Sequence, residues 1–461
     1  MPRPLQFSKR LLLSLCVILA ASSLASAQTF ATLHSFDGVD GAGPLYETLA
    51  QGRDGNLYGT TSGGTVSDGT VFRITPQGAL SVYTFDGTHG SGPFGGLVLG
   101  IDGLLRGTAQ FGGTSNDGVV FSIGPQVPVS VPLNFDGADG NLPETPLTLG
   151  VDGNYYGGTV FGGAYDFGTV FKLTPSGTLT VLHSFSSGVG LRGSLVYGPD
   201  HAFYGVTVAG GPSNQGTIFR ITPSGSFTTI YNFDGAHGFG PEAVFLANDG
   251  NFYGTTARGG EFNLGAVFRF DATGTVTVLH SFDGTDGETP EVGLIQATDG
   301  NLYGTTTQGG TGTGGLGTIF SITTGGTFTL LHNLDDFTDG GNPWRLTQHT
   351  NGKIYGTTGE GGGMACSGSG CGTVYSLDMG LGPFITFVLP FGQVGSGVQI
   401  LGQGLTGTTA VTFNGVPATT FNVASDTFME AIVPPGATTG PVQVTTPGGT
   451  LTSNVHLQIV P

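Results

Sequence analysis

Pairs of acidic residues recur along the 461-residue chain in a pattern that could bind divalent cations. An aromatic residue is followed by Asp-Gly, and a second Asp or a His stands three residues after the first Asp. The pairs with two carboxylates that we take as candidate metal ligands are Asp37 and Asp40, Asp136 and Asp139, and Asp283 and Asp286. Calcium needs more oxygen ligands than two carboxylates supply, and Asp-Gly is also typical of turns in which the Asp accepts hydrogen bonds from local backbone N–H groups. We therefore favour the turn interpretation, keep calcium as the alternative and expect no other cofactor.

A single binding site on a repetitive chain should appear where one copy of the repeat differs from the others. Trp344 is the only Trp in the chain, and a Trp beside Arg345 would suit stacking on a sugar ring if it were exposed. Arg192 follows a segment in which Ser186 and Ser187 replace the usual Asp-Gly. The other departures are Arg106 in place of a Tyr and His201 in place of a turn Gly. Divergence between copies is the simpler explanation of each, so Arg192, Trp344 and Arg345 are a hypothesis for ligand contacts.

The sequence contains no motif of a known catalytic site. Gly-x-Ser-x-Gly, His-Glu-x-x-His and a phosphate-binding Walker loop are all missing. Four histidines share one position of the repeat, namely His34, His183, His280 and His332. Because Tyr or Leu occupies that position in the other copies, we expect these histidines to pack rather than to catalyse. The acids are spaced so regularly that no carboxylate pair for glycoside cleavage can be singled out.

The elements that must position these residues come from a repeat of about 50 residues. The dipeptide Tyr-Gly occurs once per copy, with Arg106-Gly107 at the remaining place, and its first residues are Tyr58, Arg106, Tyr156, Tyr204, Tyr253, Tyr303 and Tyr355. A second marker, Gly-x-[Val/Ile]-[Phe/Tyr], also occurs seven times, and so does an apolar residue followed by Asp-Gly or a close variant of it. Three independent markers therefore indicate seven copies of one unit.

Each copy contains four short runs of β-branched and aromatic residues separated by Asp-Gly, Gly-rich and Pro-x-Gly turns, which predict four antiparallel strands. Four strands in every copy, repeated seven times, are typical of the blades of a β-propeller. Residues 29–36 match a fourth strand, whereas the seventh copy ends after its third strand. We therefore predict an all-β fold: a seven-bladed propeller over residues 28–378, closed by the N-terminal strand, and a separate β-sandwich over residues 379–461.

The first 27 residues have the pattern of a signal peptide. A basic start is followed by an apolar run from Leu11 to Ala21 and by the small-residue sequence Ala25-Ser26-Ala27. Without these residues the net charge is (13 − 3) − 31 = −21, which excludes a nucleic-acid partner. No later segment is apolar enough to span a membrane. We expect export to the periplasm, the cell surface or the medium, where Cys366 and Cys371 would form a local disulfide.

The repeat resembles the GloVer tandem repeat of exported bacterial choice-of-anchor proteins. Asp299-Gly-Asn-Leu-Tyr-Gly-Thr-Thr306 and Gly317-Thr-Ile-Phe-Ser-Ile322 carry this resemblance. It implies export and surface display and brings no catalytic residues. The C-terminal segment is similar to the IPT/TIG family of immunoglobulin-like domains, through Val411-Thr-Phe-Asn-Gly-Val-Pro-Ala418 and Gly440-Pro-Val-Gln-Val-Thr-Thr-Pro-Gly-Gly449. That family implies a binding or spacer module.

These observations favour a secreted or cell-surface recognition scaffold without enzymatic activity. Its loops would bind an extracellular glycan or a surface protein. The alternative is a carbohydrate-active enzyme, a hydrolase or lyase, with its site on the acidic face formed by the crossovers between blades. The sequence identifies neither the ligand nor the oligomeric state.

Overall fold

The computed structural model describes residues 28–460, except for 46–47, 65–67, 126, 189, 272, 313 and 336–337. The predicted signal peptide, residues 1–27, lies outside the described residues. Strands dominate this part of the chain, and one short 3-10 helix, η1 (Cys366–Gly368), is found in it. No helix among the described residues is long and apolar enough to cross a membrane.

Six antiparallel sheets follow one another along the chain, and each contains four consecutive strands. They are β2 (Ala50–Gln51), β3 (Leu57–Thr61), β4 (Thr70–Ile74) and β5 (Leu80–Thr84); β6 (Gly95–Leu99), β7 (Leu105–Ala109), β8 (Val119–Gly124) and β9 (Val127–Asn134); β10 (Thr148–Leu149), β11 (Tyr155–Gly158), β12 (Thr169–Leu173) and β13 (Leu179–Ser184); β14 (Leu191–Tyr197), β15 (Phe203–Thr207), β16 (Thr217–Ile221) and β17 (Phe227–Asn232); β18 (Phe239–Leu246), β19 (Phe252–Arg258), β20 (Ala266–Phe270) and β21 (Val276–Ser281); and β22 (Ile295–Gln296), β23 (Leu302–Thr306), β24 (Thr318–Ile322) and β25 (Phe328–Asn333). The strand order is sequential in every one of them.

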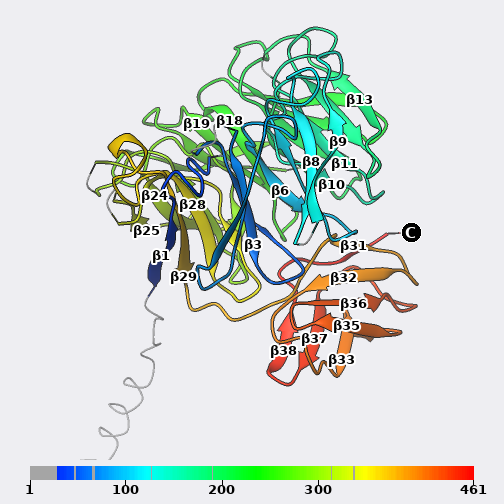
Figure 1. Ribbon diagram of the computed structural model, residues 1–461. Helices are drawn as coiled ribbons and strands as arrows, with labels where there is room; N and C mark the ends of the chain where they lie inside the picture. Colours follow the sequence, from blue (N-terminus) through cyan, green and yellow to red (C-terminus); the bar gives the residue numbers. More distant parts are fainter. Residues whose placement is uncertain are drawn as a thin grey trace, which may run out of the picture.

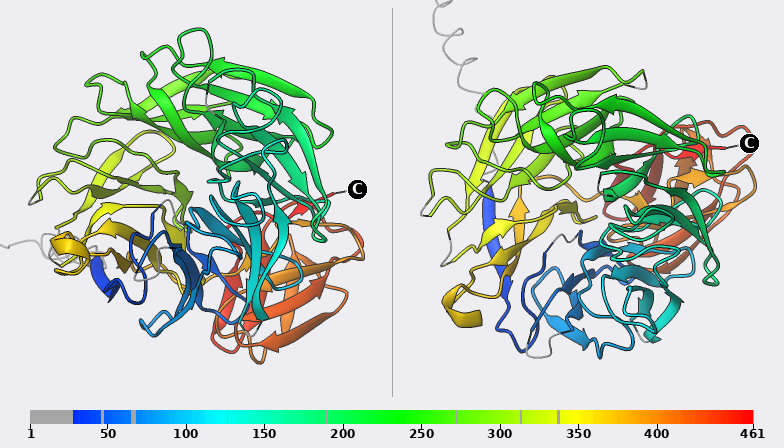
Figure 2. Two further views of the ribbon diagram at one scale, coloured as in Figure 1. Left: turned by 45° about the horizontal axis from the view of Figure 1, so that its top comes forward. Right: turned by 90° about the horizontal axis from the view of Figure 1, so that it is seen from above.

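The seventh sheet joins the two ends of this series. It consists of β1 (Thr29–Ser35), β29 (Thr373–Asp378), β28 (Ile354–Glu360), β26 (Gly341–Pro343) and β27 (Thr347–Gln348). β1 pairs antiparallel with β29 from Thr29 opposite Asp378 to Ser35 opposite Thr373, which confirms that the N-terminal strand completes the last sheet. Figure 2 shows the sheets arranged around a ring. Repeated four-stranded sheets in this arrangement are consistent with a β-propeller, and we refer to residues 29–378 as the ring.

The Tyr-Gly marker is explained by a hydrogen bond that recurs from sheet to sheet. In five sheets the Tyr hydroxyl donates to the Asp four residues earlier, in the first hairpin turn, at 2.7 to 3.2 Å. The second sheet replaces the Tyr with Arg106, whose guanidinium donates to both carboxylate oxygens of Asp102 at 3.0 and 2.6 Å. In the seventh sheet Asn351 takes the place of the Asp and donates to the Tyr355 hydroxyl. The turn acids thus fix the hairpins, as predicted for turn residues.

We expect Tyr303→Phe to lower the free energy of unfolding by about 1 kcal/mol, because a hydrogen bond to the partly exposed carboxylate of Asp299 is lost. Tyr355→Phe is the matched control, since its hydroxyl accepts from the neutral amide of Asn351 and its removal should cost less. Urea unfolding of the two variants measures the difference. Equal losses in both variants would contradict the role of the charged acceptor.

The C-terminal segment, residues 384–460, forms sheets around a core of its own. One four-stranded sheet has the order β30-β32-β36-β35 and another the order β34-β33-β37-β38, while β31 pairs with β39. The strands are β30 (Thr386–Phe387), β31 (Phe391–Gly392), β32 (Gly397–Leu401), β33 (Ala410–Phe413), β34 (Val416–Pro417), β35 (Phe421–Ser425), β36 (Phe428–Ile432), β37 (Val442–Thr446), β38 (Gly449–Thr452) and β39 (Gln458–Ile459). Both sheets contribute to one buried cluster that includes Ile400, Met429 and Val444. Figure 1 shows this segment against one face of the ring, below β3 and β6.

Candidate functional site

The C-terminal segment is fixed to the ring through the first hairpin turns of the sheets. Arg53 donates to the backbone oxygen of Ile101 and to the side chain of Gln399 at 2.6 and 2.8 Å, and its guanidinium lies 4.5 Å from the centre of the Phe428 ring. The hydroxyl of Thr427 donates to the backbone oxygen of Arg53 at 2.7 Å. These contacts hold the two parts of the chain in a defined orientation.

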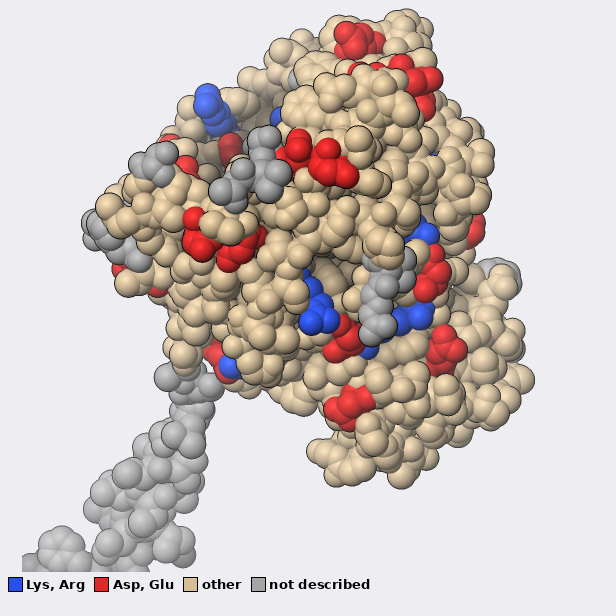
Figure 3. Space-filling model, in the orientation of Figure 1, with Lys and Arg blue, Asp and Glu red and all other residues tan. Residues whose placement is uncertain are grey.

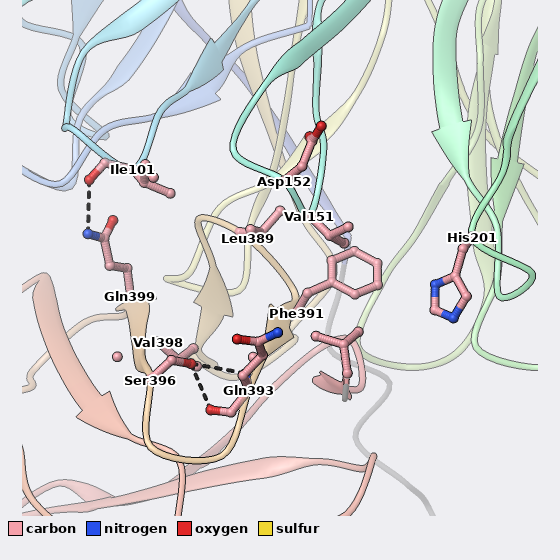
Figure 4. Close-up of a pocket in the computed structure, with 13 residues that line it drawn as sticks. Ile101, Val151, Asp152, His201, Leu389, Phe391, Gln393, Ser396, Val398 and Gln399 are labelled. Carbon is pink, nitrogen blue, oxygen red and sulfur yellow. Dashed lines mark hydrogen bonds between the residues drawn. The ribbon is translucent and has the colours of Figure 1, made fainter. Parts of the chain in front are cut away.

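Beside these contacts the two parts leave an open cleft, which we call the junction cleft. It consists of three adjoining cavities of about 540, 380 and 240 Å³, and Phe391 lines all three. The ring contributes first hairpin turns from four successive sheets, through residues such as Ile101, Val151, His201 and Asn248. Figure 4 shows Phe391 between the turn that carries Val151 and the turn that carries His201. The largest cavity has the size of a typical small-ligand site.

The lining of the junction cleft is mostly aliphatic and uncharged, with two aromatic rings, Tyr197 and Phe391. The ring of Tyr197 meets the ring of Phe391 edge-on, with centroids 5.1 Å apart. Gln393, Ser396, Gln399, Asn248 and Gln458 supply amide and hydroxyl groups, of which those of Gln399, Asn248 and Ser396 also make hydrogen bonds within the protein. Asp152 is the single carboxylate among the described lining residues, and its charge is paired with Lys172 at 3.1 Å. The cleft can therefore stack a ligand and form hydrogen bonds with it, but it holds no second acid.

His201 is the most unusual residue of this lining. Its backbone has a φ of 62°, in the left-handed region that favours glycine. The six equivalent turns of the other sheets all have a glycine with positive φ at this place, namely Gly55, Gly103, Gly153, Gly250, Gly300 and Gly352. The His201 side chain is exposed, and its Nδ1 lies 3.2 Å from the Tyr197 hydroxyl. A strained residue that faces a cleft is a candidate for function.

Two of the three predicted ligand contacts lie elsewhere, in a small cavity on the ring axis. Arg192 and Arg345 line it together with Glu144, Glu242 and Glu291. The first strands of neighbouring sheets, such as β14 and β18, contact each other here, and these charges come from five different sheets. The cavity has a volume of about 20 Å³, which is enough for one water molecule and far too small for a sugar. We call this group the axial cluster.

The axial cluster combines three acids with two bases in little space. Arg192 pairs with Glu144 at 3.3 Å, and a Cβ at Gly193 would lie 3.0 Å from Nη2 of Arg345. Burial raises the pKa of Glu144 and of Glu291, and the neighbouring Arg192 opposes this in both. Burial raises the pKa of Glu242 to about 7 against the opposing effect of Arg192 and Arg345. Glu242 is therefore expected to exchange a proton near neutral pH.

The third predicted contact, Trp344, is not available for stacking. Its side chain is 3% exposed, so the expectation of an exposed Trp beside Arg345 is wrong. Successive residues of an extended segment point to opposite sides, and here Arg345 faces the axis while Trp344 packs into the protein.

The sequence signal that could have found the axial cluster is a charge directly after a recurring Pro, as in Pro143-Glu144, Pro241-Glu242 and Pro290-Glu291.

The acids of the crossovers are engaged in their own turns. Asp37 accepts hydrogen bonds from the backbone of Val39 and Asp40, and the backbone of Asp37 donates to Asp40. The same pattern holds for Asp136 with Asp139 and for Asp283 with Asp286. Within the described part of the chain no three His, Cys, Asp or Glu side chains form a group that could hold a metal ion. Local hydrogen bonds therefore account for these carboxylates, and Figure 3 shows the acids of one face as separate small groups.

The shared histidine position has a packing role with a polar partner. His34, His280 and His332 each bring Nε2 to 2.7 Å from the second acid of the following crossover, Asp40, Asp286 and Asp339. His183, His280 and His332 also stack on a Phe ring of the next sheet. Arg106, another departure from the repeat, is 4% exposed and donates to the Tyr155 hydroxyl at 2.7 Å. Structural contacts explain these residues.

Comparison with known families decides the identity of the repeat. The profile of the Gloeobacter/Verrucomicrobia repeat matches residues 21–196, 67–247 and 147–375. These overlapping matches together span residues 21–375, which is more than half of the chain. The chain belongs to the Gloeobacter/Verrucomicrobia repeat family. The matched ranges of this family end before the C-terminal segment.

Several solved structures resemble the chain loosely. A fungal alcohol oxidase of the AA5 family in complex with copper has a TM-score of 0.49 at 13% identity, over 94% of this chain and 99% of that chain. PorZ, a surface component of the type-IX secretion system of Porphyromonas gingivalis, has a TM-score of 0.47 at 13% identity, over 93% and 61%. A protein of unknown function from Bacteroides thetaiotaomicron has a TM-score of 0.44 at 12% identity, over 76% of each chain. No curated protein matches the sequence, so the description of the fold rests on the strand pairing of this chain.

Proposed function

We propose that the chain is an exported, non-catalytic recognition protein whose junction cleft binds a neutral oligosaccharide. The N-terminal pattern of residues 1–27 supports export. A disulfide between Cys366 and Cys371 agrees with an oxidising compartment. On this proposal the ligand lies on the face of the first hairpin turns, and the acidic crossovers on the other face serve as turns.

The lining of the junction cleft carries the proposal. Aromatic rings such as Phe391 and Tyr197 offer apolar surfaces on which the C–H face of a sugar can pack. Amide, imidazole and hydroxyl groups around them can form hydrogen bonds with sugar hydroxyls. Cleavage of a glycosidic bond usually needs two carboxyl groups at a defined separation, and Asp152 is the single carboxylate of the described lining. This favours binding over hydrolysis.

We further propose that the ring is a seven-bladed β-propeller and that the C-terminal segment is an immunoglobulin-like domain of the IPT/TIG type. Two four-stranded sheets that enclose one hydrophobic core support the second assignment. Such a module would complete the binding site here, because Phe391, Gln393 and Gln399 come from it.

The proposal is tested by His201→Gly on the full chain from residue 28. Glycine is the residue of the six equivalent turns, so the variant should fold as well as the parent or be more stable by up to about 1 kcal/mol. If the cleft binds oligosaccharides, the loss of the imidazole should weaken binding by roughly five- to tenfold. A glycan array followed by titration calorimetry on the best ligand measures this.

Two further variants make the test specific. Phe391→Ala removes the shared aromatic wall and should weaken binding more than His201→Gly does, while Glu261→Gln changes an exposed acid outside the lining and should leave binding unchanged. The proposal fails if no glycan binds, or if the ligand binds the parent and both cleft variants equally. Turnover of a polysaccharide would overturn the non-catalytic assignment instead.

A further inference from the structure

A second cavity opens on the outer side of the ring, between the first and second sheets. It has a volume of about 320 Å³ and lies between β5 on one side and the hairpin of β8 and β9 on the other. Tyr58, Phe72 and Tyr83 of the first sheet and Pro125 and Pro128 of the second line it. We call it the β5–β9 groove. The C-terminal segment contributes no residue to it among those described.

Between three other pairs of neighbouring sheets, a Phe ring of one sheet stacks at the equivalent position on a His ring of the preceding sheet. Phe227 lies flat on His183 with centroids 3.8 Å apart and an interplanar angle of 3°. Phe328 stacks on His280 at 3.9 Å and Phe30 stacks on His332 at 4.2 Å, with angles of 9° and 8°. The protein thus uses this position three times as a slot for a planar ring.

The slot between the first and second sheets does not contain such a ring. The stacking Phe stands six residues before the Phe or Leu that directly follows the outer strand, as Phe227 does before Phe233. In the second sheet the residue six positions before Phe135 is Val129. Its partner across the slot is Tyr83, at the place of the stacked histidines, and Tyr83 is only partly buried. A tyrosine face therefore borders a groove in which a ring would complete the repeated contact.

The β5–β9 groove also offers hydrogen-bond donors. Arg73 lines it, and Nε of Arg73 is buried without a hydrogen-bond partner among the described residues. Its nearest acid, Asp54, lies 3.8 Å from Nη1, which is too long for a hydrogen bond. The Arg73 side chain as a whole is 39% exposed, so the exposed part of its guanidinium can donate to an oxygen acceptor in the groove.

We propose that the β5–β9 groove binds a phenolic compound, with its ring stacked on Tyr83 and its oxygen accepting a hydrogen bond from Arg73. The planar ring takes the place that Phe227, Phe328 and Phe30 take in the other sheets. The site is separate from the junction cleft and does not depend on the oligosaccharide proposal.

The test uses p-cresol as the probe and 4-methylcyclohexanol as its non-planar counterpart, with ligand-observed NMR on the chain from residue 28. We expect saturable binding of p-cresol with a dissociation constant on the order of 1 mM and at least about tenfold weaker binding of the cyclohexanol. Val129→Phe places a ring in the slot and should abolish binding. Arg73→Gln, a change of a partly exposed side chain, should weaken p-cresol binding by roughly five- to tenfold.

Val276→Phe is the matched control, because Val276 stands six residues before Phe282 and faces the sheet of Tyr231 in the same way. In that slot the equivalent of Arg73 is Arg220, whose Nε already donates to Asp200 at 2.6 Å, so the free donor of the β5–β9 groove is missing there. This variant should bind p-cresol like the parent. Absence of saturable binding up to about 10 mM, equal binding of the two probes, or unchanged binding in both Val129→Phe and Arg73→Gln would overturn the proposal. If Val129→Phe unfolds, Arg73→Gln and the pair of probes decide it.

Discussion

Deletion of residues 28–36 is expected to abolish cooperative folding of the ring. These residues form β1, which pairs with β29 along its whole length, and they end in Phe36, which is 2% exposed and lies edge-on against Phe72 of the first sheet. The deletion removes the outer strand of the seventh sheet and opens the contact between the first and last sheets. The loss should exceed about 5 kcal/mol, which is most of the stability of an ordinary domain. Urea unfolding followed by circular dichroism measures it.

A point substitution separates the buried contact from the strand pairing. Phe36→Ala keeps the β1–β29 hydrogen bonds and should cost about 3–5 kcal/mol, the range for a buried Phe. Ala31→Ser, at an exposed position of the same strand, is the matched control and should change stability by less than about 0.5 kcal/mol. If the deleted chain unfolds at the urea concentration of the parent, the ring does not depend on closure by β1.

The sequence predicts the ring well because its signals are local and repeated. Asp-Gly turns and the Tyr-Gly marker report on contacts within four residues, such as the bond from Tyr303 to Asp299, and every copy repeats them. The offset between residues 29–36 and the seventh copy also predicts the closure, since an unpaired outer strand is unfavourable.

The junction cleft could not be predicted in this way. Its walls come from turns near Ile101, Val151 and His201 and from Phe391 near the other end of the chain, and they meet because two surfaces fit together. No periodicity encodes that fit. His201 was visible in the sequence as a departure from the repeat, and so was Arg106. The structure explains Arg106 by a salt bridge with Asp102, whereas His201 lines a cleft that forms only with the docked C-terminal segment. The sequence alone could not distinguish the two.

Glu242→Gln is expected to change the pH dependence of stability strongly between pH 5 and pH 8. The pKa of Glu242 is raised to about 7 in the folded protein, whereas an unfolded Glu titrates near 4.5. Between these two pH values the folded state holds a proton that the unfolded state has released. The stabilising contribution of this proton is therefore fully present below about pH 4.5 and is lost as the pH rises through 7. Gln resembles the protonated form and does not titrate. The advantage of the variant should therefore grow by roughly 2 kcal/mol between pH 5 and pH 8.

The sign of this effect also distinguishes the axial cluster from a simple salt bridge. If Glu242 were mainly an ion-pair partner of Arg192 and Arg345, Gln would destabilise the protein most at high pH, where the carboxylate is charged. Because burial outweighs the attraction of the two bases, we expect the opposite, and Arg345→Gln should shift the loss of stability to a higher pH by removing one of those bases. Chemical unfolding from pH 5 to pH 8 measures both variants, with Glu261→Gln as the control at an exposed acid. A parallel pH profile for parent and Glu242→Gln would show that this carboxyl group titrates as it does in the unfolded chain.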